Sequence, residues 1–361
     1  MSKSQNSSEF HNLIKRDKNH WDLFTKKEEY QTNKTDKYGR ISYKFSNNEN
    51  ILNPKVSEYL IKNGFHIDYE DGKKFAIFLS HDIDDLYPSF KHLIRSLGPY
   101  PLHKQKLGFL KFIRSYSKKR TPYKNFKKIV QLEKRYNANS SFFFLSSEKD
   151  IFGKKYNVED VKDEISYLIE QDCEIGLHTS FYAYNNLEMI KHEKEKLERI
   201  IGKKIYGVRN HVYRFKTPDT WNLLSQAGFE YDSTFGYHDM VGFRNGMCHP
   251  YNPYDLNTEQ VIPIIEIPPC VVDVSLFSYM KLNADKSWIL IKKLIDDVEK
   301  LGGVLTILWH NWTFSYPVSY AGIFGKEWTD LYEKILKYGS EKNAWMTSGK
   351  NICNHFWKNN F

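Results

Sequence analysis

Short apolar runs alternate with longer amphipathic segments along most of the chain. Six runs of five to eight residues end in polar or charged residues, as buried parallel strands do. They cover residues 75–80, 140–146, 174–178, 204–210, 264–268 and 303–310. Apolar residues at helical spacing, with charges on the opposite face, predict helices between several of these runs. These helices cover residues 124–136, 161–171, 187–201 and 286–302. The alternation predicts βαβ units and a parallel sheet or barrel.

The alternation is missing from the first part of the chain. Residues 1–73 are polar, rich in Lys and Asn, and only weakly periodic, with short helical stretches such as 56–61. We therefore expect an N-terminal extension, 1–73, packed on a main α/β domain, 74–361.

A basic insertion interrupts the main domain at 88–123. Residues 91–130 hold 12 Lys and Arg and no Asp or Glu, interleaved with apolar residues. One interpretation is a basic amphipathic surface for an anionic carrier or for peripheral membrane contact. The other is a solvated, lysine-rich helical insert with a buried apolar stripe, and charge runs more often have this explanation.

Composition narrows the classes of partner and compartment. The formal charge of +9 favours anionic partners such as phosphates or nucleotide sugars, but no nucleic-acid-binding motif is present and we expect no nucleic acid partner. The four cysteines are far apart and form no CxxC pair, which favours a reducing compartment. The polar N-terminus has no signal-peptide core, and no run approaches the roughly 20 apolar residues of a membrane span. We expect a cytoplasmic protein.

Chemistry-bearing residues follow the predicted strands, where the active residues of parallel α/β proteins lie. They are His81, Asp82, Asp84, Asp85, His178, Thr179, Ser180, Arg209, His211, Glu266, Asp273, His310, Asn311 and Trp312. Alone, each is more often a cap or a hydrogen-bond partner. Together, histidines, carboxylates and an arginine on one rim form a set for metal-assisted acid–base chemistry.

These segments resemble, in order, the motifs of the polysaccharide deacetylase family, also called the NodB-homology or carbohydrate esterase four family. The matching segments are SHDIDD (80–85), GLHTS (176–180), GVRNH (207–211), FEYDSTFGY (229–237) and LTILWH (305–310). The resemblance covers roughly residues 75–345 and looks closest to a bacterial surface-polysaccharide branch with GLH, RNH, GFR and EIP segments. It implies an α/β fold, a distorted (β/α) barrel of about seven strands.

The resemblance also implies roles for the rim residues. Asp82 would be the general base, held ionised and oriented by Arg209, and His310 the general acid. Asp84 and His178 would bind a divalent metal, and their oxygen and nitrogen donors suit Zn²⁺ or a similar ion. Such a metal polarises an amide carbonyl and lowers the pKa of water.

One position departs from the family pattern. The family usually has a second metal-binding His four residues after the first, but Tyr182 stands there. Catalytic zinc normally has three protein ligands. His211, beside Arg209, is the natural replacement. His81 is a second option, although strand alternation beside Asp82 turns it to the opposite face.

Three residues are candidates for substrate binding: Arg244, Thr179 and Trp312. Arg244, in the loop 242–251, can grip a phosphate or carboxylate, or the loop can be a mere connection. Trp312 or Trp309 can stack on a sugar, and core packing explains either equally well. Cys248 beside His249 is a weak candidate nucleophile, because adjacent residues point apart in an extended chain.

These observations predict metal-dependent hydrolysis of an N-acyl group, such as N-acetyl, from a sugar or glycan intermediate in surface-polysaccharide biosynthesis. The charge favours phosphate-bearing substrates, such as nucleotide-linked or lipid-linked sugars. The alternative from another class is a non-catalytic carbohydrate-binding relative that has lost full metal coordination. A hydrolase of a non-sugar amide is a third interpretation.

Overall fold

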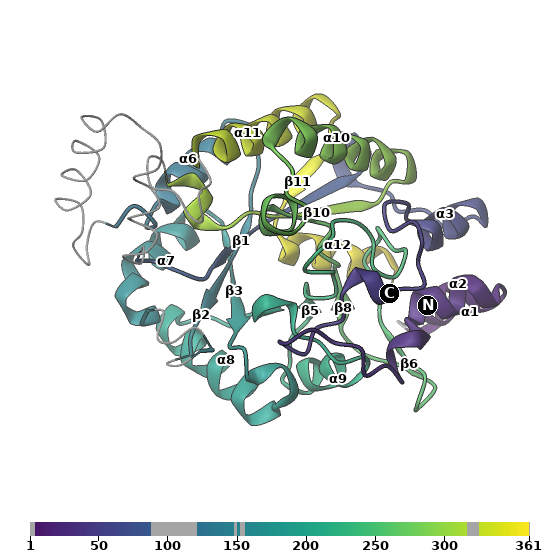
Figure 1. The fold of residues 1–361 in the computed structure, drawn as a ribbon. Helices are drawn as coiled ribbons and strands as arrows, with labels where there is room; N and C mark the ends of the chain where they lie inside the picture. Colours follow the sequence, from purple (N-terminus) through teal and green to yellow (C-terminus); the bar gives the residue numbers. More distant parts are fainter. Residues whose placement is uncertain (1–3, 88–120, 148–149, 152–155, 316–324, 361) are drawn as a thin grey trace.

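A parallel β-sheet curved into a half-barrel forms the centre of the protein (Figure 1). The computed structural model describes residues 4–87, 121–147, 150–151, 156–315 and 325–360. Within these residues the sheet has nine strands, in the order β8-β5-β4-β3-β2-β1-β10-β9, with β11 also paired to β1. The strands are β1 Ala76–Ile83, β2 Ser141–Leu145, β3 Glu174–Thr179, β4 Gly207–Asn210, β5 Tyr231–Asp232, β8 Ile265–Glu266, β9 Val271–Val272, β10 Val304–Leu308 and β11 Trp345–Thr347.

Every neighbouring pair in this sheet is parallel. Strand β1 pairs with β11 along Ala76–Phe78 and with β2 along Ser80–Ile83, while β10 runs along its other side. Among the described strands no ladder joins β8 to β9, so the barrel stays open there. The predicted α/β fold with a distorted barrel is confirmed. The sheet has more strands than the expected seven. Three of them, β5, β8 and β9, have only two residues each.

Helices cover the outside of the half-barrel (Figure 1). They are α6 Phe126–Lys134, α7 Lys162–Glu170, α8 Leu187–Ile201, α9 Asp219–Gln226, α10 Ala284–Leu301 and α11 Gly325–Glu341. Helices α8 and α10 start at asparagine caps, where Asn186 and Asn283 each accept a backbone N–H from three residues on. Both end at a glycine in the left-handed region, Gly202 and Gly302, where a Cβ atom would be strained. Capping therefore explains the observed bounds of these two helices.

Strand alternation divides the side chains of β1 between two layers. Ile77 and Leu79 pack outward in the large apolar core shared with the helices. Ala76 and Phe78 point into the half-barrel, in a second apolar cluster with Ile352 of α12 (Gly349–Asn360). Helix α12 fills the barrel interior at the N-terminal ends of the strands. The polar part of the interior therefore lies at the C-terminal ends of the strands.

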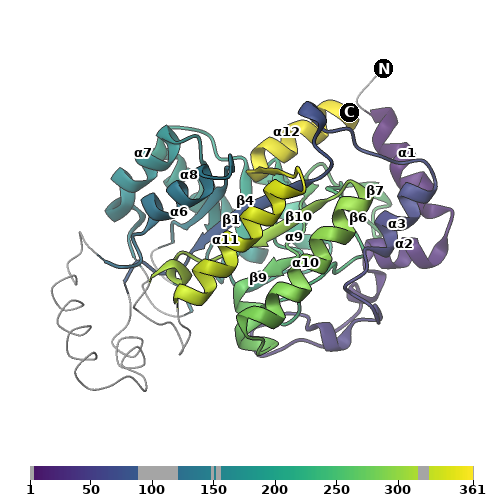
Figure 2. The same cartoon turned by 90° about the horizontal axis from the view of Figure 1, so that it is seen from above.

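The N-terminal extension packs on the long segment between β5 and β8. It contains α1 Ser4–Lys15, α2 Lys18–Thr25 and α3 Lys55–Lys62, which lie beside the hairpin of β6 Tyr254–Asp255 and β7 Gln260–Val261 (Figure 2). Apolar residues from both sides form one buried cluster: Ile14, Phe24, Val56, Leu60, Met247, Tyr251 and Tyr254. The predicted short helix at 56–61 is confirmed as part of α3.

Most of the basic insertion, residues 88–120, lies outside the described residues. Its predicted contact with an anionic carrier or a membrane surface stays a prediction. In the part of the chain that the structure describes, no helix has both the length and the apolar character needed to cross a membrane.

Candidate active site

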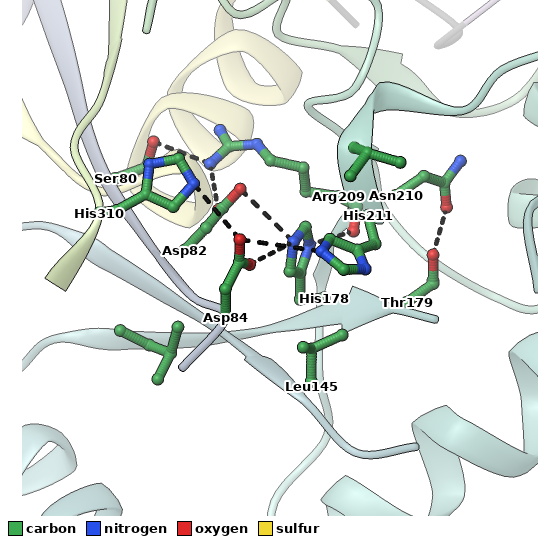
Figure 3. A network of polar contacts seen from close by, with 12 residues as sticks. Ser80, Asp82, Asp84, Leu145, His178, Thr179, Arg209, Asn210, His211 and His310 are labelled. Atoms are coloured by element: carbon green, nitrogen blue, oxygen red, sulfur yellow. Dashed lines mark hydrogen bonds and ion pairs between the residues drawn. The ribbon is translucent and has the colours of Figure 1, made fainter. Parts of the chain in front are cut away.

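The inward-facing row of β1 continues into polar residues at the C-terminal end of the strand. Ser80 and Asp82 are buried there, and Asp84 follows just beyond the strand with a side chain that is 20% exposed. Histidines from β3, the β4 end and the β10 end converge on these carboxylates (Figure 3). The rim predicted from the strand ends is thus a physical cluster.

Arg209 of β4 holds Asp82 in place. Its Nη1 atom donates to Asp82 Oδ1 at 2.8 Å and to Ser80 Oγ at 3.0 Å. Its Nε and Nη2 atoms donate to the carbonyl and the hydroxyl of Ser233, at 2.7 and 2.8 Å. Burial lowers the pKa of Arg209, but Asp82 together with Tyr213 and Tyr231 outweighs this and raises it. The fully buried guanidinium therefore stays charged and pairs with the Asp82 carboxylate.

His178 at the end of β3 presents one nitrogen to the two carboxylates. Its Nδ1 atom lies 2.8 Å from the Arg209 carbonyl oxygen. A carbonyl only accepts hydrogen bonds, so Nδ1 carries the proton of the neutral ring. Nε2 then directs its lone pair outward, 3.2 Å from Asp84 Oδ1 and 3.6 Å from Asp82 Oδ2.

His211, just after β4, has the same arrangement with a carboxylate as its partner. Its Nδ1 atom lies 2.9 Å from Asp150 Oδ2, and its Nε2 atom lies 3.7 Å from Asp84 Oδ2. Metal-binding histidines commonly donate their other N–H to a carboxylate or carbonyl in this way, which fixes ring and tautomer. Burial lowers the pKa of His211, but Asp84 and Asp150 outweigh this and raise it to about 10.

Asp84, His178 and His211 together can hold a metal ion. Each offers one ligand atom, and these atoms all lie within 4.8 Å of one another. Asp84 Oδ1 makes no aligned hydrogen bond within the described residues, as suits a ligand atom. Burial raises the pKa of Asp84, but His211 and His178 outweigh it and hold this pKa well below its ordinary value. The ionised carboxylate and two imidazoles, with His211 releasing its Nε2 proton as the ion binds, are a donor set that fits zinc or a similar divalent ion.

His310, after β10, faces the same carboxylate from the other side. Its Nε2 atom lies 3.6 Å from Asp84 Oδ2, and its Nδ1 atom lies 2.7 Å from Asp273 Oδ1. The second oxygen of Asp273 accepts the backbone N–H of His310 at 2.7 Å. Burial lowers the pKa of His310, but Asp273 outweighs it and raises it to about 9. A histidine that stays protonated at neutral pH can act as a general acid.

The three predicted substrate residues lie in different surroundings. Thr179 is buried and donates to Asn210 Oδ1 at 2.8 Å, so it braces the end of β4. Trp312 is stacked on the His310 ring, with centroids 5.1 Å apart. Its exposure is only 3%, and Trp309 is fully buried.

Arg244 has partners within the protein. Its Nε and Nη2 atoms donate to the two oxygens of Glu29 in the N-terminal extension, at 3.0 and 2.8 Å, and Nη1 donates to the Gly236 carbonyl at 3.0 Å. The side chain is 2% exposed. The guanidinium thus joins the extension to the main domain, which favours the connecting-loop interpretation, while contact with a substrate phosphate or carboxylate stays a prediction.

The structure distinguishes between the candidates for the third metal ligand. His81 points into the helix layer, where Nδ1 lies 2.7 Å from the Trp309 carbonyl and Nε2 2.9 Å from Glu133 Oε1. Tyr182 is 49% exposed, with its ring against Phe181. Of these positions, only His211 reaches Asp84 and His178 within the described residues.

Cys248 is unsuited to be a nucleophile. It is 1% exposed, and burial raises its pKa to about 12, which disfavours the thiolate. The neighbouring His249 ring contacts Ser57 Oγ and the Leu301 carbonyl, at 2.9 and 3.1 Å, on the side of the domain covered by α3.

Asp150 is the site residue that the sequence analysis missed. It is buried, and besides the His211 ring it accepts the backbone N–H of Phe181 at 2.9 Å. It follows the predicted strand at 140–146 by four residues. The same strand-end rule, applied to that strand, would have included it.

Comparisons with known proteins identify solved structures with a similar fold. No family model and no curated protein matches the sequence. The structure is similar to that of a protein from Mycobacterium smegmatis assigned as a polysaccharide deacetylase, with a TM-score of 0.54 and 17% identity, over 80% of this chain and 92% of that one. One weaker match is the peptidoglycan deacetylase PdaC from Bacillus subtilis, with a TM-score of 0.38 and 14% identity, over 80% of this chain and 95% of that one. Another is a carbohydrate esterase four pseudoenzyme from Bacillus anthracis, with a TM-score of 0.38 and 11% identity, over 79% of this chain and 66% of that one.

At this level of identity the likeness concerns the fold. The chain has an α/β half-barrel similar to that of a protein assigned as a polysaccharide deacetylase, with a candidate Asp-His-His metal site at its strand ends.

Proposed function

We propose that this chain is a metal-dependent deacetylase that hydrolyses an N-acyl group, most simply N-acetyl, on a sugar. The observation that carries the proposal is one connected cluster. His178, His211 and the Asp273–His310 pair face Asp84, and the Asp82–Arg209 pair faces His178. Amide hydrolysis needs a base, an electrophile and an acid, and one rim supplies a residue for each.

The roles follow from the hydrogen bonds. A divalent ion held by Asp84, His178 and His211 would polarise the amide carbonyl and acidify water. Asp82, kept ionised by Arg209, accepts the proton of the attacking water at Oδ2, because Oδ1 is engaged by the guanidinium. His310 donates its Nε2 proton to the leaving amine, and Asp273 holds the ring through Nδ1.

We propose zinc as the metal and a phosphate-bearing sugar as the substrate. Two imidazoles and one carboxylate are a common ligand set of catalytic zinc. The formal charge of +9 supports a phosphate-bearing substrate, such as a nucleotide-linked or lipid-linked sugar. Cytoplasmic surface-polysaccharide biosynthesis is the pathway we propose for it.

The test is release of acetate from N-acetylated sugars, free, nucleotide-linked and lipid-linked, by the zinc-loaded protein. We expect His310→Ala and Asp82→Asn to lower kcat by about 100-fold or more while sugar binding persists. A zinc-loaded wild type that binds these sugars without releasing acetate would instead support the non-catalytic carbohydrate-binding alternative.

A further inference from the structure

The backbone just after His211 adopts a conformation that its residues disfavour. Val212 has φ 53° and Tyr213 has φ 60°, both in the left-handed region. A residue with a Cβ atom is uncommon there, and a β-branched one such as valine is rare, because Cβ crowds the backbone. Two non-glycine residues in this conformation in succession need outside support. This turn follows His211 directly, so its shape, together with the Asp150 contact at Nδ1, bears on where the His211 ring points.

The N-terminal extension supplies a contact that supports this turn. Arg40 Nη1 donates to the Val212 carbonyl oxygen at 3.2 Å, across 172 residues of sequence. Arg40 is 5% exposed. A hydrogen bond from a charged donor is stronger than one between neutral groups, so this contact is well suited to hold a strained carbonyl.

The Arg40 guanidinium is itself fixed. Asp36 Oδ2 accepts from Nε and Nη2 of Arg40, at 2.9 and 2.8 Å. Asp36 Oδ1 accepts the backbone N–H groups of Tyr38 and Arg40, at 2.9 and 3.0 Å, which closes the loop 36–40. Nη2 also donates to the Tyr279 hydroxyl at 3.2 Å. The ion pair neutralises Arg40, so its effect on a nearby cation would come through geometry more than through charge.

We propose that Arg40 is a positioning residue of the metal centre: it holds the Val212 carbonyl and thereby keeps His211 aimed at Asp84. The N-terminal extension then completes the metal site of the main domain. This inference rests on the proposed metal-dependent function, because His211 needs to be aimed only if it binds a metal.

The experiment measures zinc affinity of the full-length protein by competition with a chromogenic chelator. We expect Arg40→Gln to weaken zinc binding about ten-fold, as loss of a supporting contact typically does. Tyr279→Phe is the matched control, because it removes another partner of the same guanidinium and leaves the Val212 contact; we expect its affinity within about two-fold of wild type. Equal zinc affinity of Arg40→Gln and wild type, or an equal loss in Tyr279→Phe, would overturn the proposal.

A double variant tests whether strain in the turn after His211 is the reason. Glycine adopts a left-handed conformation without strain, so in a Val212→Gly protein the Arg40→Gln change should weaken zinc binding by less than about three-fold. An undiminished loss of zinc affinity in this double variant would overturn the proposal. If Arg40→Gln does not fold, Arg40→Lys replaces it, since lysine keeps the charge beside Asp36 but lacks the planar fork.

Two further readouts separate the explanations. A merely structural Arg40 would lower Tm equally with and without zinc, whereas a positioning residue reduces the rise in Tm that zinc produces. A wild type that binds no zinc would defeat the proposed function and this inference with it. If the wild type and the Arg40→Gln protein bind zinc equally well, the inference about Arg40 is wrong, but the proposed function is unaffected.

Discussion

The Asp84 carboxylate lies within 3.7 Å of three imidazole Nε2 atoms, those of His178, His211 and His310. Each ring has its Nδ1 atom engaged by a different acceptor: the Arg209 carbonyl, Asp150 and Asp273, respectively. These acceptors fix which nitrogen faces the site. The position after a strand could indicate the histidines and Asp150, but not that Asp150 pairs with His211, which is 61 residues away in the chain.

The Asp273–His310 pair leads to a prediction about pH. His310 acts as an acid only while protonated, so activity should fall as pH rises through its raised pKa of about 9. Asp273→Asn removes the charge that raises this pKa while burial still lowers it, so the alkaline limb of kcat/KM should move down by about one pH unit or more.

The pH profiles of wild type, Asp273→Asn and the control Asp285→Asn, which changes an exposed carboxylate at the start of α10, check this prediction. An alkaline limb that stays in place in Asp273→Asn would show that His310 is not the titrating acid.

At the scale of elements, the two-residue period of β1 separates the candidate site from the packed helix layer. Asp82 points into the barrel beside Arg209, and its neighbour His81 points into the helix layer beside Glu133. The strand period predicts this separation from the sequence alone.

His81→Ala tests the separation. The change takes a hydrogen-bond partner from Glu133, which is 1% exposed, so the protein should lose about 2 kcal/mol of unfolding free energy. Zinc content and kcat of the folded variant should match wild type. Chemical denaturation and metal analysis give both quantities, and a loss of zinc in the folded protein would mean that His81 belongs to the metal site after all.

The elements that the sequence predicts well are the long or strongly periodic ones. The predicted helix at 187–201 has the bounds of α8, and those at 286–302 and 124–136 overlap α10 and α6. The strands β5 and β9, with two residues each, are too short to show a period, and their pairing depends on neighbours far away in the chain. Tertiary contacts, not local pattern, define these edges of the barrel.

At the scale of the whole molecule, a buried ion pair joins the N-terminal extension to the main domain. Arg244 and Glu29 pair across 215 residues, both nearly inaccessible to solvent. The sequence analysis expected Arg244 in a substrate loop, because no local pattern reveals a partner so distant in the chain. The described structure makes the extension part of the same packed unit as the barrel.

Arg244→Ala should therefore act on stability. It leaves Glu29 buried without its partner, and we expect a loss of about 3 kcal/mol or more of unfolding free energy. KM for a phosphate-bearing sugar should stay unchanged in the folded variant. Denaturant titration and steady-state kinetics measure the two effects, and a raised KM with unaltered stability would support the substrate-loop hypothesis instead.

The central claim is that Asp84, His178 and His211 form one metal site, and metal content tests it most directly. The wild type, purified without chelator, should contain about one zinc or other divalent ion per chain, and His178→Ala and His211→Ala should both lose it. Metal retained in His211→Ala would contradict the assigned third ligand. A wild type that stays metal-free even after reconstitution with Zn²⁺ would contradict the catalytic account as a whole.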